Sequence, residues 1–560
     1  MTVALHDLLP ATLRRTWAVD GTCPDLDLYS LYRAHQIADP HRTAVLDAKG
    51  QLCYTALDRK ARCLAAGLLG LGIRAGDVVG IQLPNGRGTV IADLALAALG
   101  AVALPFPVGR GGREAASLLR RSEAVAVIAA AEHRGNHHAS DLLALADDLP
   151  ALHTVIAAGS AGTTPEGTVA LSELLRTDPK AFVPARPAPD TAARILVSSG
   201  SEAEPKMVAY SHNALAGGRG NFLGSLIPDG RPPRCLFLVP LASAFGSNGT
   251  AVTLARHGGT LIMLDHFTPE AALEALAEHE PTHVLGVPTM IRMMLDRIAE
   301  GAHREFTPPT AVVVGGSPLD EATAAEARRA FGCPVVNLYG SADGVNCHTG
   351  LAGASVSGDG RPGIAAGTPD PRVADIRIAV PGVHELQEVP RGTVGEIVAR
   401  GPMTPLCYVA APDLDTRYRT ADGWVRTGDL GLIDEDGTLR VVGRLKDVVI
   451  RGGANISPAE VEAELAAHPG VRDVVCVGVP DPLMGERLAA CVVPREDAAL
   501  TLEELRSYLD GRGLERRKHP ELLSLLGELP LTPAGKPDRA ALREQCTTAA
   551  EEQRPLASAG

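Results

Sequence analysis

The chain has 560 residues, 45% of them hydrophobic and only 3% aromatic, so it is long enough for several globular units with cores of Ala, Leu and Val. Its formal net charge of −13 argues against a nucleic-acid partner and an anionic membrane surface, because phosphate groups would be repelled overall. The ten cysteines show neither a CxxC pair nor zinc-finger spacing, which favours a reducing cytoplasm over a disulfide framework or a metal site. The N-terminal residues do not resemble a secretory signal, and no apolar stretch is long enough to span a membrane.

The first part of the chain alternates short apolar strands with helical patterns. Apolar spacing predicts helices at 28–37 and 54–71, a strand at 78–85, a helix to residue 99 and a strand at 101–107. Further strands are predicted at 124–130, 235–240, 260–264, 283–288, 311–317 and 334–341. This rhythm predicts parallel sheets covered by helices, with ligands at the carboxyl ends of the strands.

The pattern changes after residue 393. Short strands with Gly or Asp turns predict a small β-rich unit, and a strand at 448–451 opens a second pattern. A helix begun by Ser457 and Pro458, strands at 474–479 and 488–493 and a helix from residue 502 complete it. We therefore expect an N-terminal domain over 1–445, a separate α+β domain over 446–546 and a flexible tail over 547–560.

The segment ILVSSGSEAEPKMVAYSH, residues 195–212, passes from a predicted buried strand into a loop of small hydroxyl and glycine residues. Backbone N–H groups, hydroxyls and the ammonium of Lys206 suit such a loop for holding phosphate oxygens. It is not a Walker loop, because the pattern GxxxxGK[ST] is absent. The alternative is an ordinary Ser/Gly turn between two strands.

Five motifs follow one another along the chain: SSGSEAEPK (198–206), YGSAD (339–343), WVRTGD (424–429), GRLKDVVIRGGANISPAEVE (443–462) and LTPAGKPDR (531–539). In this order and spacing they resemble the adenylate-forming superfamily of acyl- and aryl-CoA synthetases, carrier-protein-directed aryl-acid ligases, nonribosomal adenylation domains and beetle luciferase. The resemblance covers nearly the whole length. It implies a large N-terminal α/β domain of parallel-type sheets with a small β-rich subdomain, followed by a small mobile α+β domain.

The resemblance also implies a reaction. A carboxylic acid attacks the α-phosphorus of ATP, pyrophosphate leaves, and the acyl group passes to the thiol of coenzyme A or of a carrier-protein phosphopantetheine. Catalysis then consists mostly of positioning and of cationic stabilisation of the transition state. In this resemblance Lys536 bridges the acyl oxygen and the α-phosphate, Lys206 serves the phosphates, and Asp343 holds Mg²⁺.

Nucleotide contacts carry over to matching positions. Asp429 is expected to accept hydrogen bonds from the ribose, Arg444 to assist there or at the phosphates, and Tyr339 to lie against adenine. The full set implied for ATP is Ser198, Ser199, Gly200, Ser201, Lys206, Gly315, Gly316, Ser317, Tyr339, Gly340, Ser341, Ala342, Asp343, Asp429, Arg444 and Lys536. The alternatives are a surface lysine at 536 and an Asx turn at 429.

Lys446 matches the hinge of the superfamily. Rotation there is implied to remove Lys536 from the site and to bring in the strand with Gly452 and Gly453, which would let pantetheine pass close to the backbone. The alternative for this Gly-Gly pair is a β-bulge.

The chain departs from the usual motifs in three segments. Glu202 and Ala203 replace Thr-Gly in the loop and Glu204 follows, so these carboxylates either face solvent or weaken the hold on pyrophosphate. Asp343 replaces Glu and is one methylene shorter, so its reach to Mg²⁺ is in question unless a water intervenes. Ser243 replaces an aromatic or histidine residue that normally gates the acid pocket.

Residues expected at the acid pocket are Ser243, Phe245, Gly246, Asn248, Gly316, Gly340 and Asn346, and apart from the phenylalanine they are small or polar. They favour a compact aryl, cyclic or short functionalised acid. Two other hypotheses remain, a catalytically weakened homologue that binds nucleotide or acyl-adenylate, and a medium- or long-chain fatty acyl ligase. Expected partners are the acid and an acyl or aryl carrier protein, and the expected assembly is a monomer or homodimer.

Overall fold

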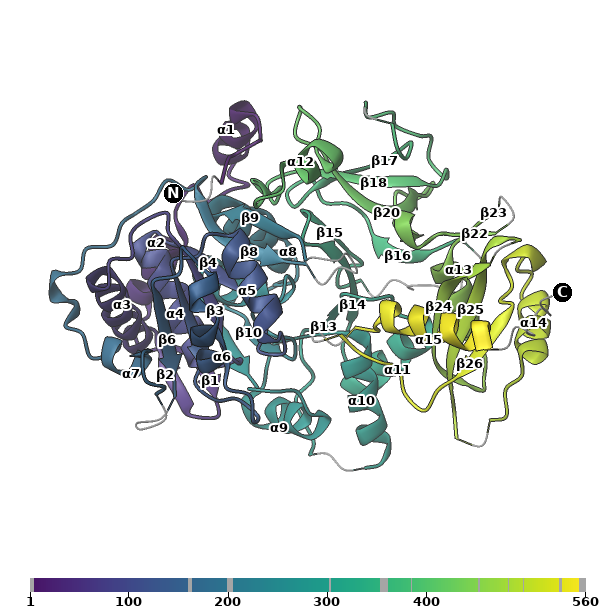
Figure 1. Ribbon diagram of the computed structural model, residues 1–560, viewed down its shortest axis with the longest axis horizontal. Helices are drawn as coiled ribbons and strands as arrows, with labels where there is room; N and C mark the ends of the chain where they lie inside the picture. Colours follow the sequence, from purple (N-terminus) through teal and green to yellow (C-terminus); the bar gives the residue numbers. More distant parts are fainter. Residues whose placement is uncertain are drawn as a thin grey trace.

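The computed structural model describes residues 5–159, 164–198, 205–301, 304–352, 361–383, 385–451, 454–481, 483–496, 498–532 and 536–552, which form four sheets (Figure 1). The first sheet has the order β19-β9-β8-β4-β3-β5-β6-β7. Its strands are β3 (Val78–Gln82), β4 (Val102–Pro105), β5 (Ala126–Ala130), β6 (Thr154–Ala158), β7 (Val169–Ala170), β8 (Ala192–Val197), β9 (Met207–Ser211) and β19 (Cys407–Tyr408).

The second sheet has the order β15-β14-β13-β12-β10-β11-β1-β2. Its strands are β1 (Thr43–Asp47), β2 (Gly50–Cys53), β10 (Arg234–Phe237), β11 (Thr260–Met263), β12 (His283–Gly286), β13 (Ala311–Gly315), β14 (Val335–Ser341) and β15 (Val345–His348). The central strands run parallel, as the βαβ rhythm predicts.

The third sheet is antiparallel, with the order β16-β21-β20-β18-β17. Its strands are β16 (Ile364–Gly367), β17 (Asp375–Ala379), β18 (Gly395–Arg400), β20 (Val425–Ile433) and β21 (Leu439–Arg444). The fourth sheet has the order β23-β22-β25-β24, with β26 paired to β25. Its strands are β22 (Val449–Arg451), β23 (Ala454–Ile456), β24 (Val471–Asp481), β25 (Gly485–Pro494) and β26 (Leu522–Leu525).

Helices cover the sheets and separate them. They are α1 (Ala11–Val19), α2 (Leu28–Ala38), α3 (Tyr54–Gly70), α4 (Arg87–Leu99), α5 (Gly112–Arg121), α6 (His138–Ala144), α7 (Leu171–Leu174), α8 (Gly220–Gly224), α9 (Pro269–His279), α10 (Pro288–Ala299), α11 (Glu321–Phe331), α12 (Pro412–Tyr418), α13 (Pro458–Leu465), α14 (Leu502–Gly511) and α15 (Arg539–Glu552). In α4 every residue from Thr89 onward is buried, which fits its nearly continuous apolar sequence.

The predicted α/β fold class is confirmed, with two differences in detail. The edge strands β2, β15 and β19, and β9 beside β19, run antiparallel to their neighbours. The nine residues between β8 and β9 are too few for a parallel crossover, which needs a dozen or more. Helix α15 also continues to Glu552, through residues that we expected to be a tail, because Leu542 and Cys546 pack against the fourth sheet.

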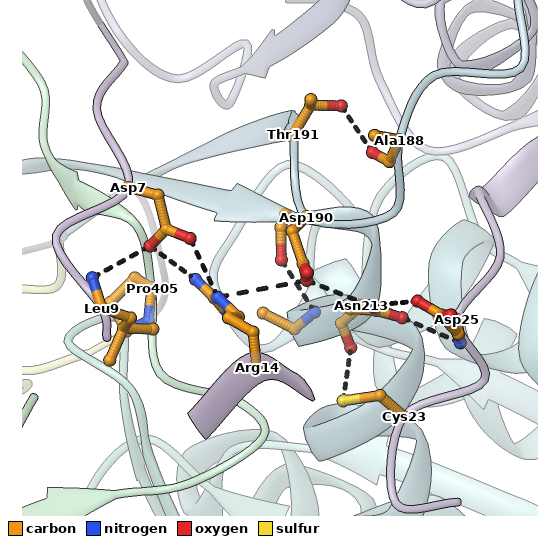
Figure 2. Close-up of polar contacts among 12 residues, drawn as sticks. Asp7, Leu9, Arg14, Cys23, Asp25, Ala188, Asp190, Thr191, Asn213 and Pro405 are labelled. Atoms are coloured by element: carbon orange, nitrogen blue, oxygen red, sulfur yellow. Dashed lines mark hydrogen bonds and ion pairs between the residues drawn. The ribbon is translucent and has the colours of Figure 1, made fainter. Parts of the chain in front are cut away.

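The N-terminal segment contacts the residues that just precede and just follow the β8–β9 hairpin (Figure 2). Arg14 on α1 is buried, donates two hydrogen bonds to Asp7, at 3.1 and 3.0 Å, and lies 4.0 Å from Asp190, just before β8. Asn213, just after β9, donates to Asp190 at 3.0 Å and accepts from the backbone N–H of Asp25 at 3.1 Å. These contacts fix the base of the hairpin whose connecting loop is the predicted phosphate loop.

Candidate active site

Lys536 lies where the fourth sheet meets the second. A Cβ atom placed on Gly316, directly after β13, would stand 3.2 Å from Lys536 Cε and 3.7 Å from its Nζ. Gly316 has a φ of +92°, a conformation that favours glycine, so glycine suits this position both for its backbone and for the approach of the lysine. The Thr532 backbone N–H donates to the carbonyl of Lys536 at 2.7 Å and holds its turn.

Asp429 on β20 connects two other predicted nucleotide residues. The hydroxyl of Tyr339 on β14 donates to Asp429 Oδ2 at 2.7 Å, and Arg444 Nε lies 3.1 Å from Asp429 Oδ1. Arg444 is in place because β20 and β21 pair with Asp429 opposite Arg444. Burial raises the pKa of Asp429 and the charge of Arg444 opposes the rise, while Asp429 raises the pKa of Arg444.

These residues share one electrostatic environment with Lys536. The pKa of Lys536 is lowered to about 8, mainly by burial and also by the positive charge of Arg444, while Asp429 acts in the opposite direction. The structure therefore brings together Lys536, Gly316, Asp429, Arg444 and Tyr339, which come from four separate motifs and the end of β13.

Asp343 is buried at the end of the turn between β14 and β15. Ser341 Oγ donates to Asp343 Oδ2 at 2.6 Å, and the hydroxyl of Tyr408 donates to Asp343 Oδ1 at 2.7 Å. The negative charge of Asp343 also contributes to the raised pKa of Asp429. The carbonyl of the neighbouring Ala342 accepts a hydrogen bond from the buried Tyr210 hydroxyl at 2.9 Å.

Lys206 closes the predicted phosphate loop from its C-terminal side. Its backbone N–H donates to Ser198 Oγ at 3.0 Å, and its carbonyl accepts from the Ser198 N–H at 2.9 Å. The ammonium lies 4.0 Å from the ring centroid of Tyr418 and 5.6 Å from that of Tyr408. The loop positions Ser199, Gly200, Ser201, Glu202, Ala203 and Glu204 lie outside the described residues.

The segment after β10 forms a tight turn. Ser243 Oγ donates to the Pro240 carbonyl at 2.8 Å and accepts from the Gly246 N–H at 2.9 Å. A Cβ atom on Gly246 would stand 1.9 Å from the Pro240 oxygen, so only glycine fits there. Ser243 therefore closes this turn, and Phe245 between them is half-buried.

A buried ion pair supports that turn. Arg194 on β8 lies 2.8 Å from Asp93 on α4 and donates to the Leu241 carbonyl at 2.7 Å. Thr250 also donates to Asp93, at 2.9 Å. The pair thereby links the strand that enters the phosphate loop to the turn of the predicted acid pocket.

Two asparagines of the predicted acid pocket have unused polar atoms. Asn346 is buried, sits opposite Gly340 in the β14–β15 pairing, and its Oδ1 would lie 2.3 Å from a Cβ on Gly340. Within the described part of the chain, Asn346 Nδ2 and Asn248 Oδ1 are buried without a hydrogen-bond partner. Buried polar atoms are normally paired, so both are candidates to meet a polar group of a ligand.

The remaining predicted residues are the neighbours of Gly316, the hinge residue and the glycine pair of the thiol channel. Gly315 is the last residue of β13 and lies beside Leu338. Ser317, two residues later, is half-buried. Lys446 is exposed in the short turn Leu445–Asp447 between the third and fourth sheets. Gly452 and Gly453 lie outside the described residues, so their predicted role at a thiol channel stays a prediction.

The structure adds residues that motif reasoning missed. Tyr408 and Tyr418 flank Lys206, and Arg292 on α10 lies 2.9 Å from Asp473 on β24, joining the second sheet's helices to the fourth sheet. Arg292 also donates to the carbonyl of Arg472 and to Asp320. None belongs to one of the five motifs, and only the tertiary arrangement brings them to the site or its interface.

No cluster of three or more His, Cys, Asp or Glu side chains suited to a metal ion occurs among the residues described. In the same part of the chain, every helix is too short or too polar to cross a membrane.

Comparisons with known proteins agree with this geometry. The family model "AMP-binding enzyme" matches residues 33–409, and the model "AMP-binding enzyme C-terminal domain" matches residues 460–536. The chain is 31% identical to a 2-hydroxy-7-methoxy-5-methyl-1-naphthoate–CoA ligase of Streptomyces carzinostaticus over 90% of each chain. It is 32% identical to a salicyl-AMP ligase/salicyl-S-ArCP synthetase of Mycobacterium tuberculosis, over 90% of this chain and 88% of the relative.

Solved structures give the same result. The ATP-bound MatB of Rhodopseudomonas palustris superposes with a TM-score of 0.79 at 26% identity, covering 94% of this chain and all of that one. Together with the family models, the motifs and the placement of Lys536, these matches assign both fold and activity. The chain belongs to the AMP-binding enzyme family, the adenylate-forming superfamily, and is an AMP-forming acid–thiol ligase.

Proposed function

We propose that this ligase activates a compact aryl acid with a polar ring substituent, forming an acyl-adenylate at the site around Lys536 and then an acyl thioester. The observation that carries the proposal is the contact between Lys536 and Gly316, beside Asp429 and Arg444. A cation held there can stabilise charge on an α-phosphate and an acyl oxygen. A nucleotide-binding homologue without activity has no evident use for a lysine in this position.

The nucleotide would occupy the space that these residues border. Both carboxylate oxygens of Asp429 can still accept hydrogen bonds from ribose hydroxyls. The hydrogen bond from the Tyr339 hydroxyl to Asp429 holds the tyrosine ring beside this carboxylate. Lys206 lies at the base of the loop proposed for the β- and γ-phosphates. In this arrangement the chain's part in adenylation is to orient ATP and acid and to supply positive charge.

Asp343 fits a role in holding Mg²⁺ with ATP. Magnesium is usually bound through one or two carboxylates and substrate phosphates, and a single buried carboxylate therefore suffices. Each oxygen of Asp343 accepts one hydrogen bond in the structure and keeps a further lone pair. Bound there, the ion would neutralise charge on the phosphates.

The unpaired polar atoms of Asn346 and Asn248 support an acid with hydrogen-bonding groups rather than an alkyl chain. A site built to pair with a substrate hydroxyl rejects an analogue that lacks it, because its own buried groups are then unpaired. Two of the relatives carry hydroxylated aryl acids in their names, which supports the same class.

For the second half-reaction we propose that residues 446–546 act as a mobile domain, rotating at Lys446 so that Lys536 leaves and the segment with Gly452 and Gly453 enters. The acceptor would be coenzyme A or a carrier-protein phosphopantetheine; both kinds of acceptor occur in the relatives' names.

All ten cysteines are free thiols, which supports our proposal that the enzyme works in the reducing cytoplasm.

Trapping the adenylate with hydroxylamine tests the proposal. Purified enzyme, ATP and Mg²⁺ are incubated with benzoate, salicylate, other hydroxybenzoates and octanoate, and hydroxamates are quantified by mass spectrometry. We expect a hydroxylated aryl acid to exceed benzoate, and octanoate to give little product. Asn346→Leu should narrow the difference between hydroxylated acid and benzoate. A preference for octanoate would overturn the aryl assignment.

A further inference from the structure

Tyr408 sits between the two charged groups proposed to serve the phosphates. It belongs to β19, a two-residue strand that adds to the edge of β9, with Tyr408 opposite Val208 and Cys407 opposite Ala209. Because β9 begins directly after the phosphate loop, this pairing delivers the buried tyrosine to the loop's end from a distant part of the chain.

The hydroxyl of Tyr408 contacts Asp343. It donates to Asp343 Oδ1 at 2.7 Å, while Ser341 donates to Oδ2 at 2.6 Å, so each carboxylate oxygen has one fixed donor. Hydrogen bonds to a charged group are stronger and shorter than neutral ones.

The ring of Tyr408 faces the other side. Lys206 Nζ lies 5.6 Å from its centroid and 4.0 Å from that of Tyr418, and the two rings are 6.1 Å apart at an interplanar angle of 56°. A cation within about 6 Å of a ring face is attracted by its quadrupole. Tyr408 therefore contacts Asp343 through its hydroxyl and Lys206 through its ring.

The backbone of Tyr408 is held independently of its hydroxyl. Its N–H donates to Asp415 Oδ1 at 3.0 Å, and the flanking Val409 N–H donates to the Met207 carbonyl at 2.8 Å. Removing the hydroxyl alone would leave these contacts and the ring in place, so the effect of the bond to Asp343 can be measured separately.

We propose that Tyr408 is a positioning residue for Mg²⁺-ATP: its hydroxyl sets the orientation of the Asp343 carboxylate and so offsets the short reach of an aspartate at this position. This inference rests on the proposed role of Asp343 in holding the metal–nucleotide complex. An aspartate has fewer rotatable bonds than a glutamate, and with Oδ1 and Oδ2 each held by a hydroxyl its free lone pairs face fixed directions. The carboxylate is thus preorganised before the nucleotide arrives.

The test uses Tyr408→Phe. Tyr418→Phe is the matched control, because it also removes a phenolic hydroxyl but leaves the hydrogen bond from Tyr408 to Asp343 intact. ATP binding is measured by calorimetry over a series of Mg²⁺ concentrations and in EDTA, and acid-dependent pyrophosphate exchange is titrated with Mg²⁺. For Tyr408→Phe we expect the Mg²⁺ concentration at half-maximal effect to rise about tenfold in both assays, as loss of a hydrogen bond to a charged group predicts. ATP affinity in EDTA and the KM for the acid should stay near wild type.

A Tyr408→Phe enzyme with wild-type Mg²⁺ dependence would overturn the inference and leave the proposed function standing. An equal shift in Tyr418→Phe would also overturn it, because the effect would then not depend on Asp343. If wild type shows no acid-dependent exchange, the proposed function fails, and calorimetry alone still decides whether Tyr408 affects Mg²⁺-ATP binding.

Ser341→Ala covers the case in which Tyr408→Phe folds poorly, and a double-mutant cycle measures the coupling between Tyr408 and Asp343. Ser341→Ala removes the other donor to Asp343 and leaves Tyr408 unchanged. We expect it also to raise the Mg²⁺ concentration needed for half-maximal effect. In Asp343→Asn the further change Tyr408→Phe should add less than twofold. Additive effects of Asp343→Asn and Tyr408→Phe on Mg²⁺-ATP binding would contradict positioning.

Discussion

The side chain of Lys536 lies against the backbone of Gly316, with Lys536 Cε 3.2 Å from the point where a Cβ on Gly316 would stand. The two residues are 220 positions apart: Gly316 directly follows β13 of the second sheet, and Lys536 lies between β26 of the fourth sheet and helix α15. Under the proposed function, this contact places the Lys536 cation beside the residues proposed to hold the nucleotide, which is the arrangement that adenylation requires.

Lys536→Ala should abolish adenylation and spare the second half-reaction. Losing the cation removes charge stabilisation of the transition state, a loss of about 10²- to 10³-fold or more for one such group. Thioester formation from supplied acyl-adenylate should stay within a few-fold of wild type. Both rates can be followed by chromatography of acyl-adenylate and acyl-CoA. Lys49→Ala, at an exposed turn, is the control, and equal loss of both half-reactions in Lys536→Ala would contradict domain alternation.

Gly316→Ala separates backbone strain from contact with Lys536. Alanine at a φ of +92° costs about 1–2 kcal/mol, and its methyl group would press on the lysine. Gly72→Ala is a close control, because Gly72 has a φ of +94° with nothing within 4 Å of the new Cβ. Both variants should lose similar stability in thermal unfolding.

Only Gly316→Ala should slow adenylation, by about tenfold, corresponding to ~1.4 kcal/mol on the barrier. Thioester formation from supplied acyl-adenylate should be unaffected in both variants. An equal loss of adenylation in Gly72→Ala would assign the effect to general destabilisation instead.

Adenylation should fall as pH rises through about 8. The protonated Lys536 is the active form, and its pKa is lowered to about 8 by burial and by Arg444, so the ammonium is lost above that pH in the free enzyme. The kcat/KM profile reports free-enzyme pKa values and should show this descending limb. Lys536→Arg keeps its charge and should lack the limb, whatever its overall rate. A wild-type profile that is flat from pH 7 to 9.5 would contradict the assignment.

Asp429→Asn should weaken ATP binding about tenfold or more, because the carboxylate loses charge-assisted hydrogen bonding to the ribose and its pairing with Arg444. Tyr339→Phe removes one donor to Asp429 and keeps the ring, so its effect should be smaller. Calorimetry with ATP and with deoxy-ATP measures how much binding each variant, Asp429→Asn and Tyr339→Phe, loses at the ribose. If wild type and Asp429→Asn bind ATP equally, Asp429 does not hold the nucleotide.

Asp473→Asn should shift the balance between the two domain arrangements. The pair with Arg292 is half exposed, so its loss is worth roughly 0.2–1 kcal/mol, or up to about fivefold in the arrangement seen here. Adenylation should slow by that factor while thioester formation from supplied adenylate does not. Glu388→Gln removes a surface ion pair with Arg377 inside the third sheet and should change neither.

The sequence predicts the parts of the fold that depend on local pattern. Buried strands such as β13, with the sequence AVVVG, and the helix begun by Ser457 and Pro458 occur where expected. Motif residues also meet as the resemblance implies, including Asp429, Arg444 and Lys536.

What could not be predicted depends on tertiary pairing. Tyr408 reaches Asp343 only because a two-residue strand adds to β9, and two residues carry no periodic signal. Ser243, expected at the acid pocket, uses its hydroxyl to close a turn, which a substitution pattern cannot reveal. The unpaired amide of Asn346 likewise depends on its position opposite Gly340.

The most direct measurement is exchange of labelled pyrophosphate into ATP, made with wild type and Lys536→Ala, with and without a hydroxylated aryl acid. We predict rapid exchange in wild type that requires the acid and Mg²⁺, and none in Lys536→Ala. Exchange in the absence of any acid, or undiminished exchange in Lys536→Ala, would contradict adenylation at this site.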